Sequence, residues 1–149
     1  MRNGLVPLII ACGLAGQAAH AQASGPVSIA LTFSDKAQAE LTTRGEGVVV
    51  SAYYMGDPAP GASLPVNEIG TIFLQSEDLT LQAGPAKLVL GANIGNAPLD
   101  QVTQPMMNVN VFSARWTSED NLIDCGFLDA PMADLAAAPQ EIHCRLIGE

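Results

Sequence analysis

The stretch VVVSAYYM, at residues 48–55, decides the fold of this 149-residue chain. Its β-branched and aromatic residues are the types enriched in β-strands, and Ser51 is the only polar residue among them. A strand that is apolar on both sides is expected at the centre of a sheet. The stretch therefore predicts a central β-strand, which ends at the Gly- and Pro-rich loop of residues 56–61.

Segments on both sides of this strand also have strand patterns. Residues 27–33 alternate Val, Ile, Leu and Phe with Ser, Ala and Thr, which is the period of two of a half-buried strand. Turn residues recur roughly every ten positions, and this spacing favours antiparallel pairing. Further strands are expected at residues 69–75, 79–82, 86–90, 107–116, 122–128 and 141–147.

Some segments are less regular. Residues 37–44 suit either a helical turn or a loop or irregular strand, and residues 131–138 suit either one helical turn or coil. Residues 91–105 are rich in Gly, Asn and Pro, so we expect them to cross from one sheet to the other. The apolar side of the strand at residues 107–116 changes near Phe112, which indicates a bulge or burial on both sides.

Together these patterns predict an all-β fold, an antiparallel two-sheet sandwich of seven to nine short strands in one domain over residues 22–149. Its general layout resembles immunoglobulin-like and transthyretin-like sandwiches. The Cys-Trp-Cys order of antibody domains is absent, because Trp116 precedes both Cys125 and Cys144. We expect a C-terminal disulfide between these two cysteines, which are 19 positions apart and close a loop worth roughly 3 kcal/mol.

The N-terminus predicts a signal peptide over residues 1–21. It combines a basic second residue, an apolar run at residues 5–16 and a small-x-small cleavage site ending at Ala21. Cleavage after Ala21, or after Ala23, would make the protein periplasmic or secreted, without a transmembrane segment. The stretch Ile-Ile-Ala-Cys12 resembles the lipobox of bacterial lipoproteins, which implies lipid anchoring through Cys12 as an alternative.

The mature chain is strongly acidic. The leader removes one of 6 basic residues and none of 15 acidic residues, which takes the formal net charge from −9 to −10. This balance argues against nucleic acid, whose phosphates require basic residues, and against anionic membrane surfaces. A cationic protein partner fits the charge better.

No catalytic motif is visible in the sequence. His143 is the single histidine after the leader, and there is no nucleophile elbow, phosphate-binding loop or His-Glu-x-x-His motif. A hydrolase that uses paired carboxylates is the remaining enzyme class. We therefore expect an exported, non-enzymatic binding or envelope-assembly protein without a cofactor.

Two places are candidates for partner binding. Arg115 and Trp116 form a pair of the types enriched at interface hot spots, and Tyr53 and Tyr54 lie beside the Gly- and Pro-rich loop. The structural alternative is that Trp116 fills one end of the core while Arg115 pairs with a nearby carboxylate. The stretch Ser-Ala-Arg-Trp resembles the Ser-Gly-Ala-Arg-Tyr stretch of a periplasmic lysozyme-inhibitor family, which implies inhibition of a basic cell-wall hydrolase as an alternative function.

An acidic segment is a candidate cation site. Within six residues it carries four oxygen-bearing side chains, the ligand type that Ca²⁺ prefers: Glu119, Asp120, Asn121 and Asp124. Their spacing differs from the EF-hand loop, and the same residues are typical of a hairpin turn. A calcium- or carbohydrate-binding module is thus another alternative.

Intact-mass spectrometry of the exported protein tests the leader prediction. We expect a chain that begins at Gln22 or Ser24, because the peptidase cleaves after a small-x-small site. A chain that begins with a lipid-modified Cys12 would contradict this prediction and support anchoring instead. The variant Cys12→Ala is the control, since it leaves cleavage after Ala21 unchanged.

Overall fold

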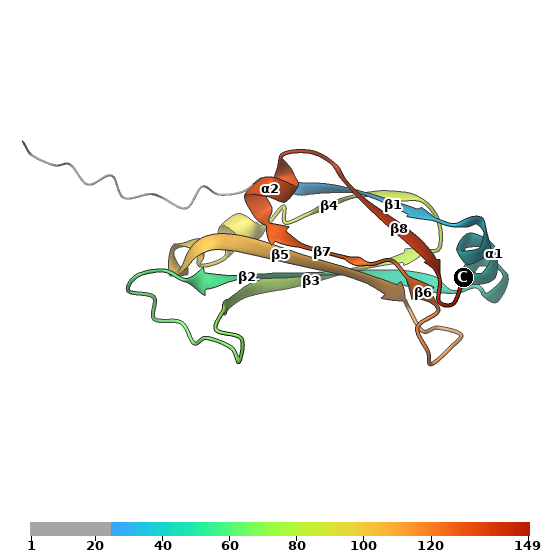
Figure 1. The fold of residues 1–149 in the computed structure, drawn as a ribbon, viewed down its shortest axis with the longest axis horizontal. Helices are drawn as coiled ribbons and strands as arrows, with labels where there is room; N and C mark the ends of the chain where they lie inside the picture. Colours follow the sequence, from blue (N-terminus) through green and yellow to red (C-terminus); the bar gives the residue numbers. More distant parts are fainter. Residues whose placement is uncertain (1–24) are drawn as a thin grey trace, which may run out of the picture.

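Two four-stranded sheets pack face to face in the computed structural model, which describes residues 25–149 (Figure 1). The strands are β1 (Val27–Phe33), β2 (Gly47–Pro58), β3 (Ile72–Gln82), β4 (Ala86–Leu90), β5 (Val102–Ser113), β6 (Ile123–Asp124), β7 (Phe127–Pro131) and β8 (Gln140–Leu146). One sheet has the order β4-β1-β8-β6 and the other β3-β2-β5-β7. The predicted signal peptide and the predicted lipid site at Cys12 lie outside the described residues.

The predicted centre of the fold is confirmed, since β2 lies between β3 and β5 in its sheet. Alternate residues of β2 point into the core, and Val48, Val50, Ala52 and Tyr54 are fully buried. The residues between them point to solvent, because successive side chains of a strand leave opposite faces. Hence both sides of β2 are apolar, but the facing sheet covers only one of them.

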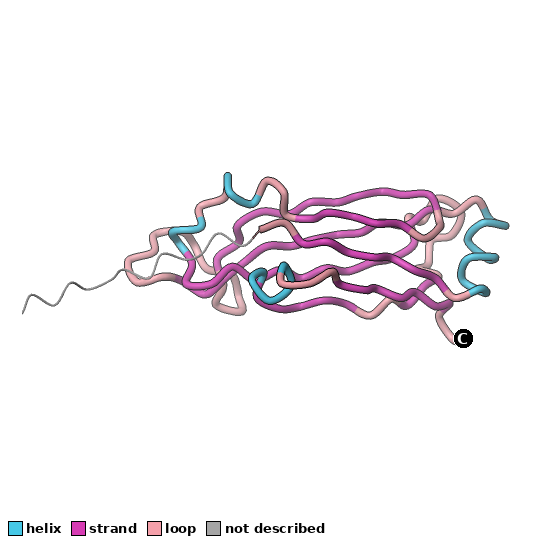
Figure 2. The backbone as a smooth tube through the Cα atoms, turned by 90° about the horizontal axis from the view of Figure 1, so that it is seen from above, coloured by secondary structure: helices cyan, strands magenta, loops and turns pink. Residues whose placement is uncertain are grey.

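Helices close the sandwich at its ends. The ambiguous segment is the helix α1 (Asp35–Arg44), whose first turn is capped by the Ser34 hydroxyl, which accepts from the Ala37 amide at 3.1 Å. Gly45, with φ 68°, ends it in the left-handed conformation that glycine adopts without strain. Figure 2 places α1 at one end of the strands and the short helical turns of the β4–β5 connection near the other.

The other helical elements are short. The segment that was either a helical turn or coil is α2 (Met132–Ala136), which buries Met132 and Leu135. The β4–β5 connection crosses between the sheets as expected and contains two 3-10 turns, η1 (Ile94–Asn96) and η2 (Leu99–Gln101). Within residues 25–149, no helix has the length and apolar character needed to cross a membrane.

The prediction of wholly antiparallel sheets is wrong for one pair of strands. β1 and β8 run parallel, with Ile29 beside Gln140 and Phe33 beside Cys144, whereas β1 and β4 are antiparallel. Turn signals report only how strands that follow one another pair. The β1–β8 pair joins the two ends of the domain, so no turn in the sequence reveals its direction.

Three local predictions are also wrong. Residues 76–78, which separate two of the expected strands, lie inside β3, and the expected strand at residues 122–128 is two strands, β6 and β7, in different sheets. The apolar side of β5 does not change at Phe112, because the inward series continues from Val111 to the buried Ser113. Because Ser113 is polar, the sequence does not show that the inward-facing series continues to this residue. The Ser113 hydroxyl and amide donate to the Asn121 side-chain oxygen at 3.2 and 2.9 Å.

The predicted disulfide between Cys125 and Cys144 is present. It links the connection between β6 and β7 to β8, which is the inner neighbour of β6. Cys144 is fully buried and belongs to the core. The disulfide therefore holds the short edge strand β6, which pairs with β8 through only two residues.

Candidate binding surface

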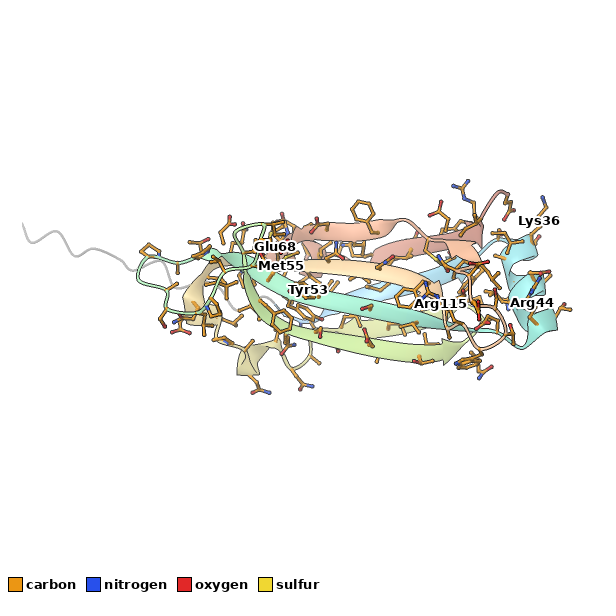
Figure 3. All side chains as sticks on the ribbon, turned by 90° about the horizontal axis from the view of Figure 1, so that it is seen from below. Lys36, Arg44, Tyr53, Met55, Glu68 and Arg115 are labelled. Carbon is orange, nitrogen blue, oxygen red and sulfur yellow. A yellow bond between two sulfur atoms is a disulfide. The ribbon has the colours of Figure 1, made fainter. Side chains whose placement is uncertain are left out.

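The solvent side of the sheet β3-β2-β5-β7 gathers the side chains that alternate with the core, and we call it the outer face. Figure 3 views the molecule from this side. Residues that are paired across antiparallel strands project to the same side, so the register assigns the members of each strand. They are Val49, Ser51, Tyr53 and Met55 of β2, Phe73, Ser76, Asp78 and Thr80 of β3, Met106, Asn108, Asn110 and Phe112 of β5, and Phe127 and Asp129 of β7.

The outer face is rich in aromatic side chains. Four of the seven aromatic residues in the chain belong to the outer face by register. A fifth, Trp116, lies over Gly47 at the end of this face. Phe127 is 71% exposed, Trp116 50%, Phe73 46% and Tyr53 37%. The rings of Tyr53 and Phe73 are in contact, with their centroids 4.8 Å apart. Exposed aromatic groups on one face are typical of interaction surfaces.

A recess lies on the outer face where the loop between β2 and β3 turns back over the sheet. Its volume is about 440 Å³, and it is lined by Tyr53, Met55, Asn67, Glu68, Ile69 and Asn108. Asn67 shapes the loop, because its side-chain oxygen accepts from the amides of Ile69 and Thr71 at 3.1 and 3.0 Å. Figure 3 shows Glu68 close to Met55 and Tyr53.

A buried carboxylate organises the opposite end of the outer face. Glu46 is 1% exposed, and its two oxygens accept four hydrogen bonds of 2.8 to 3.0 Å. The donors are the amides of Gly47, Trp116 and Thr117 and the hydroxyl of Thr117. Glu46 thus joins the start of β2 to the turn that follows β5.

The same carboxylate orients Arg115 and Trp116. Arg115 has φ 60°, a left-handed conformation that is costly for a side-chain-bearing residue, and the amides of the next two residues donate to Glu46. The Trp116 ring lies directly on Gly47, where an added Cβ would come within 2.6 Å of it. Only glycine fits at this position, and the ring is held half-exposed at the surface.

The balance of burial and hydrogen bonds sets the ionisation of Glu46. Desolvation by burial raises its pKa, but the hydrogen bonds from Trp116, Thr117 and Gly47 outweigh that effect, so the pKa lies below its ordinary value. Glu46 is therefore ionised at neutral pH. Its charge strengthens every one of these hydrogen bonds.

The predicted partner-binding residues have different positions. Tyr53 lies in the recess, and Arg115 and Trp116 are exposed at the other end of the same face. The prediction that Tyr54 binds a partner is wrong, because its side chain is fully buried. Its hydroxyl donates to Glu77, which also accepts from the Gly91 amide at 2.6 Å. Burial and the hydrogen bond to Glu77 raise the pKa of Tyr54, so it stays neutral and structural.

The structural alternative for the tryptophan is also wrong. Trp116 covers the outer side of β2 instead of filling the end of the core, and it remains half-exposed. Arg115 makes no ion pair with Glu119 or Asp120, since Arg44 with Glu40 is the one ion pair among the described residues.

The predicted calcium ligands are not brought together. The side-chain oxygen of Asn121 accepts from Ser113, and an oxygen of Asp124 accepts from the Gly126 amide at 3.1 Å. These contacts are those of turns. In the part of the chain that the structure describes, Glu119, Asp120 and Asp124 do not form a group that holds a metal, and no other set of three such acidic, histidine or cysteine residues does.

Several residues of the surface were missed by sequence reasoning. Phe73 and Phe127 lie on the outer face, Glu68 and Ile69 border the recess, and Glu46 is buried. A glutamate between two glycines is the sequence of an exposed turn, and nothing in it indicates burial. Phe127 does have a signal, because it lies two positions from Asp129 on the solvent side of its strand.

No protein-family model, curated protein or solved structure matches this chain. The resemblance to immunoglobulin-like or transthyretin-like sandwiches therefore stays a prediction about layout.

The variant Glu46→Gln tests the role of the buried carboxylate. The amide accepts with only one of its two heavy atoms, so we expect a loss of about 2 kcal/mol in the free energy of unfolding at pH 7, measured by urea denaturation. Because the folded pKa of Glu46 is lowered, its stabilising effect is present above the unfolded pKa of about 4.3 and lost as the pH falls through the folded pKa. The difference between the two proteins must therefore shrink from pH 6 to pH 3.

The matched control is Glu119→Gln, which makes the same chemical change at an exposed position and should change stability by less than about 0.5 kcal/mol. Equal stability of wild type and Glu46→Gln at pH 7 would show that the carboxylate does not hold the turn.

Proposed function

We propose that this chain is an exported, non-enzymatic protein that binds a protein partner through its outer face, either alone or as part of an envelope assembly. The observation that carries the proposal is the collection of five of the seven aromatic residues at one solvent-exposed sheet surface. Aromatic residues are enriched at protein interfaces, where a few residues carry most of the binding energy, and folding alone gives no reason to expose Phe127 or Phe73.

The distribution of charge supports a cationic partner. By register, the outer face carries the carboxylates of Asp78 and Asp129, and Glu68 borders its recess. The basic side chains Lys36, Arg44 and Arg115 gather at the α1 end (Figure 3). A positively charged partner is therefore attracted to the part of this face that carries the carboxylates.

Photocrosslinking in the exporting cell tests the proposed surface. With p-benzoylphenylalanine at position 127 or 73, we expect discrete adducts with one basic protein, because both side chains are exposed on the outer face. Position 89, where Val89 is 56% exposed on the other sheet, is the control and should give no such adduct. Excess unlabelled mature protein must compete the adducts away.

Adducts of equal yield from positions 89 and 127, or none from either position on the outer face, would contradict the proposal. A variant that combines Phe73→Ala with Phe127→Ala should fail to compete, since it removes the two most exposed aromatic side chains of the sheet.

Inhibition of a basic cell-wall hydrolase is a second candidate, which one specific observation favours. Arg115 and Trp116 are exposed on a turn that Glu46 holds rigidly, which is how an inhibitor presents a ready-made binding loop. A preformed loop of this kind loses little conformational entropy on binding.

A lysis assay tests this second candidate. The mature protein, in molar excess over a basic lysozyme, should slow the lysis of bacterial cell walls, and Arg115→Ala should weaken inhibition by about tenfold or more. Lys87→Ala, on the other sheet, is the matched control. Unchanged lysis at every ratio would exclude this activity for the lysozyme used.

A further inference from the structure

We propose that the recess on the outer face receives a lysine or arginine side chain of the protein partner. The proposal rests on the proposed function and names the group that the surface recognises. Its elements are the aromatic ring of Tyr53, the apolar side chains of Met55 and Ile69, and the carboxylate of Glu68, all of which line one recess of about 440 Å³.

The walls of the recess fit the stem of a long basic side chain. Such side chains bury their methylene groups along apolar surface while the charged group stays near water. Tyr53, Met55 and Ile69 supply that apolar surface, and Ile69, although 75% exposed, lies at the rim on the loop between β2 and β3. The face of an aromatic ring also attracts a cation directly.

The polar groups of the recess fit the charged end. Glu68 is exposed, and within residues 25–149 its side chain makes no hydrogen bond or ion pair. Asn108 is also without a side-chain hydrogen bond in the described part of the chain, and Asp129 is its direct neighbour on β7. Asn67 contributes only shape, because its amide is already engaged within the loop.

The surroundings favour a cation over an anion. None of the residues that line the recess is basic, and Lys36, Arg44 and Arg115 lie toward the α1 end of the molecule, away from Glu68 (Figure 3). Arg145, on β8, belongs to the other sheet, as does Lys87 on β4. An incoming ammonium or guanidinium group thus meets carboxylates without a competing positive charge nearby.

Titration of the isotope-labelled mature protein with two small probes, followed by NMR, tests the proposal. The probes are N-acetyl-lysine methylamide and the uncharged N-acetyl-norleucine methylamide, which has a similar stem without the ammonium group. We expect the lysine probe to shift the amide signals of Tyr53, Ile69 and Asn108 and to bind severalfold more tightly than the norleucine probe. Equal binding of the two probes, or shifts spread over both sheets, would overturn the proposal.

Variants separate the charge from the ring. Glu68→Gln should weaken binding of the lysine probe by about two- to fivefold without affecting the norleucine probe, as expected for an exposed ion pair. Glu141→Gln, the same change on an exposed residue of the other sheet, should leave both probes unaffected. Tyr53→Phe keeps the ring and should retain binding, whereas Tyr53→Leu should lose about two- to fivefold. No effect of Glu68→Gln or of Tyr53→Leu would overturn the proposal.

The crosslinking experiment distinguishes this proposal from the one on which it rests. If the adduct from position 127 forms equally well in wild type and in Glu68→Gln, the outer face is the interface but the recess does not receive a basic side chain. If the adduct is reduced severalfold in Glu68→Gln and unchanged in Glu141→Gln, the recess contributes as proposed. If the lysine probe binds but no adduct forms, the recess binds a basic side chain, but the proposed protein-binding function is wrong.

Discussion

The alternation of side chains along β2 is the constraint on which the rest of the structure depends. Four alternate residues of β2 are fully buried: Val48, Val50, Ala52 and Tyr54. The side chains of the residues between them must therefore project from the opposite side of the strand. A shift of one residue would exchange the two sets and place Tyr53 in the core. The core and the candidate binding surface are thus two sides of one strand, and neither can change register without the other.

Two carboxyl groups hold this strand at its ends, the buried Glu46 and the half-buried Glu77. Near its start, Glu46 accepts hydrogen bonds from the turn after β5 and so fixes Trp116 over Gly47. Near its end, the Tyr54 hydroxyl donates to Glu77 of the edge strand β3, and Glu77 also accepts from Gly91, just after the edge strand β4 of the other sheet. An inward-pointing charge on an edge strand is one way in which proteins discourage edge-to-edge aggregation. Here the same charge also connects the two sheets.

More of the fold than of the candidate binding surface could be predicted from the sequence. The central strand, the first strand, the last strand and the disulfide follow from local pattern and from the number of cysteines, and these predictions agree with the structure. The positions of Tyr53 and Tyr54 could not be separated, because both sides of β2 are apolar and the choice of inner side depends on the facing sheet. Glu46 was unpredictable for a similar reason: its burial comes from Trp116 and Thr117, about 70 positions along the chain.

The parallel pairing of β1 and β8 has a consequence for the order in which the protein folds. Thr32 and His143, whose side chains meet across this pair at 2.9 Å, are 111 positions apart. β1 lies between β4 and β8, so its sheet remains incomplete until the last strand of the chain is available. Contacts that span such long segments form late, because the entropy of closing the loop must be overcome first. A chain that emerges from the ribosome, or crosses a membrane, with its N-terminus leading therefore cannot complete this sheet until β8 has followed.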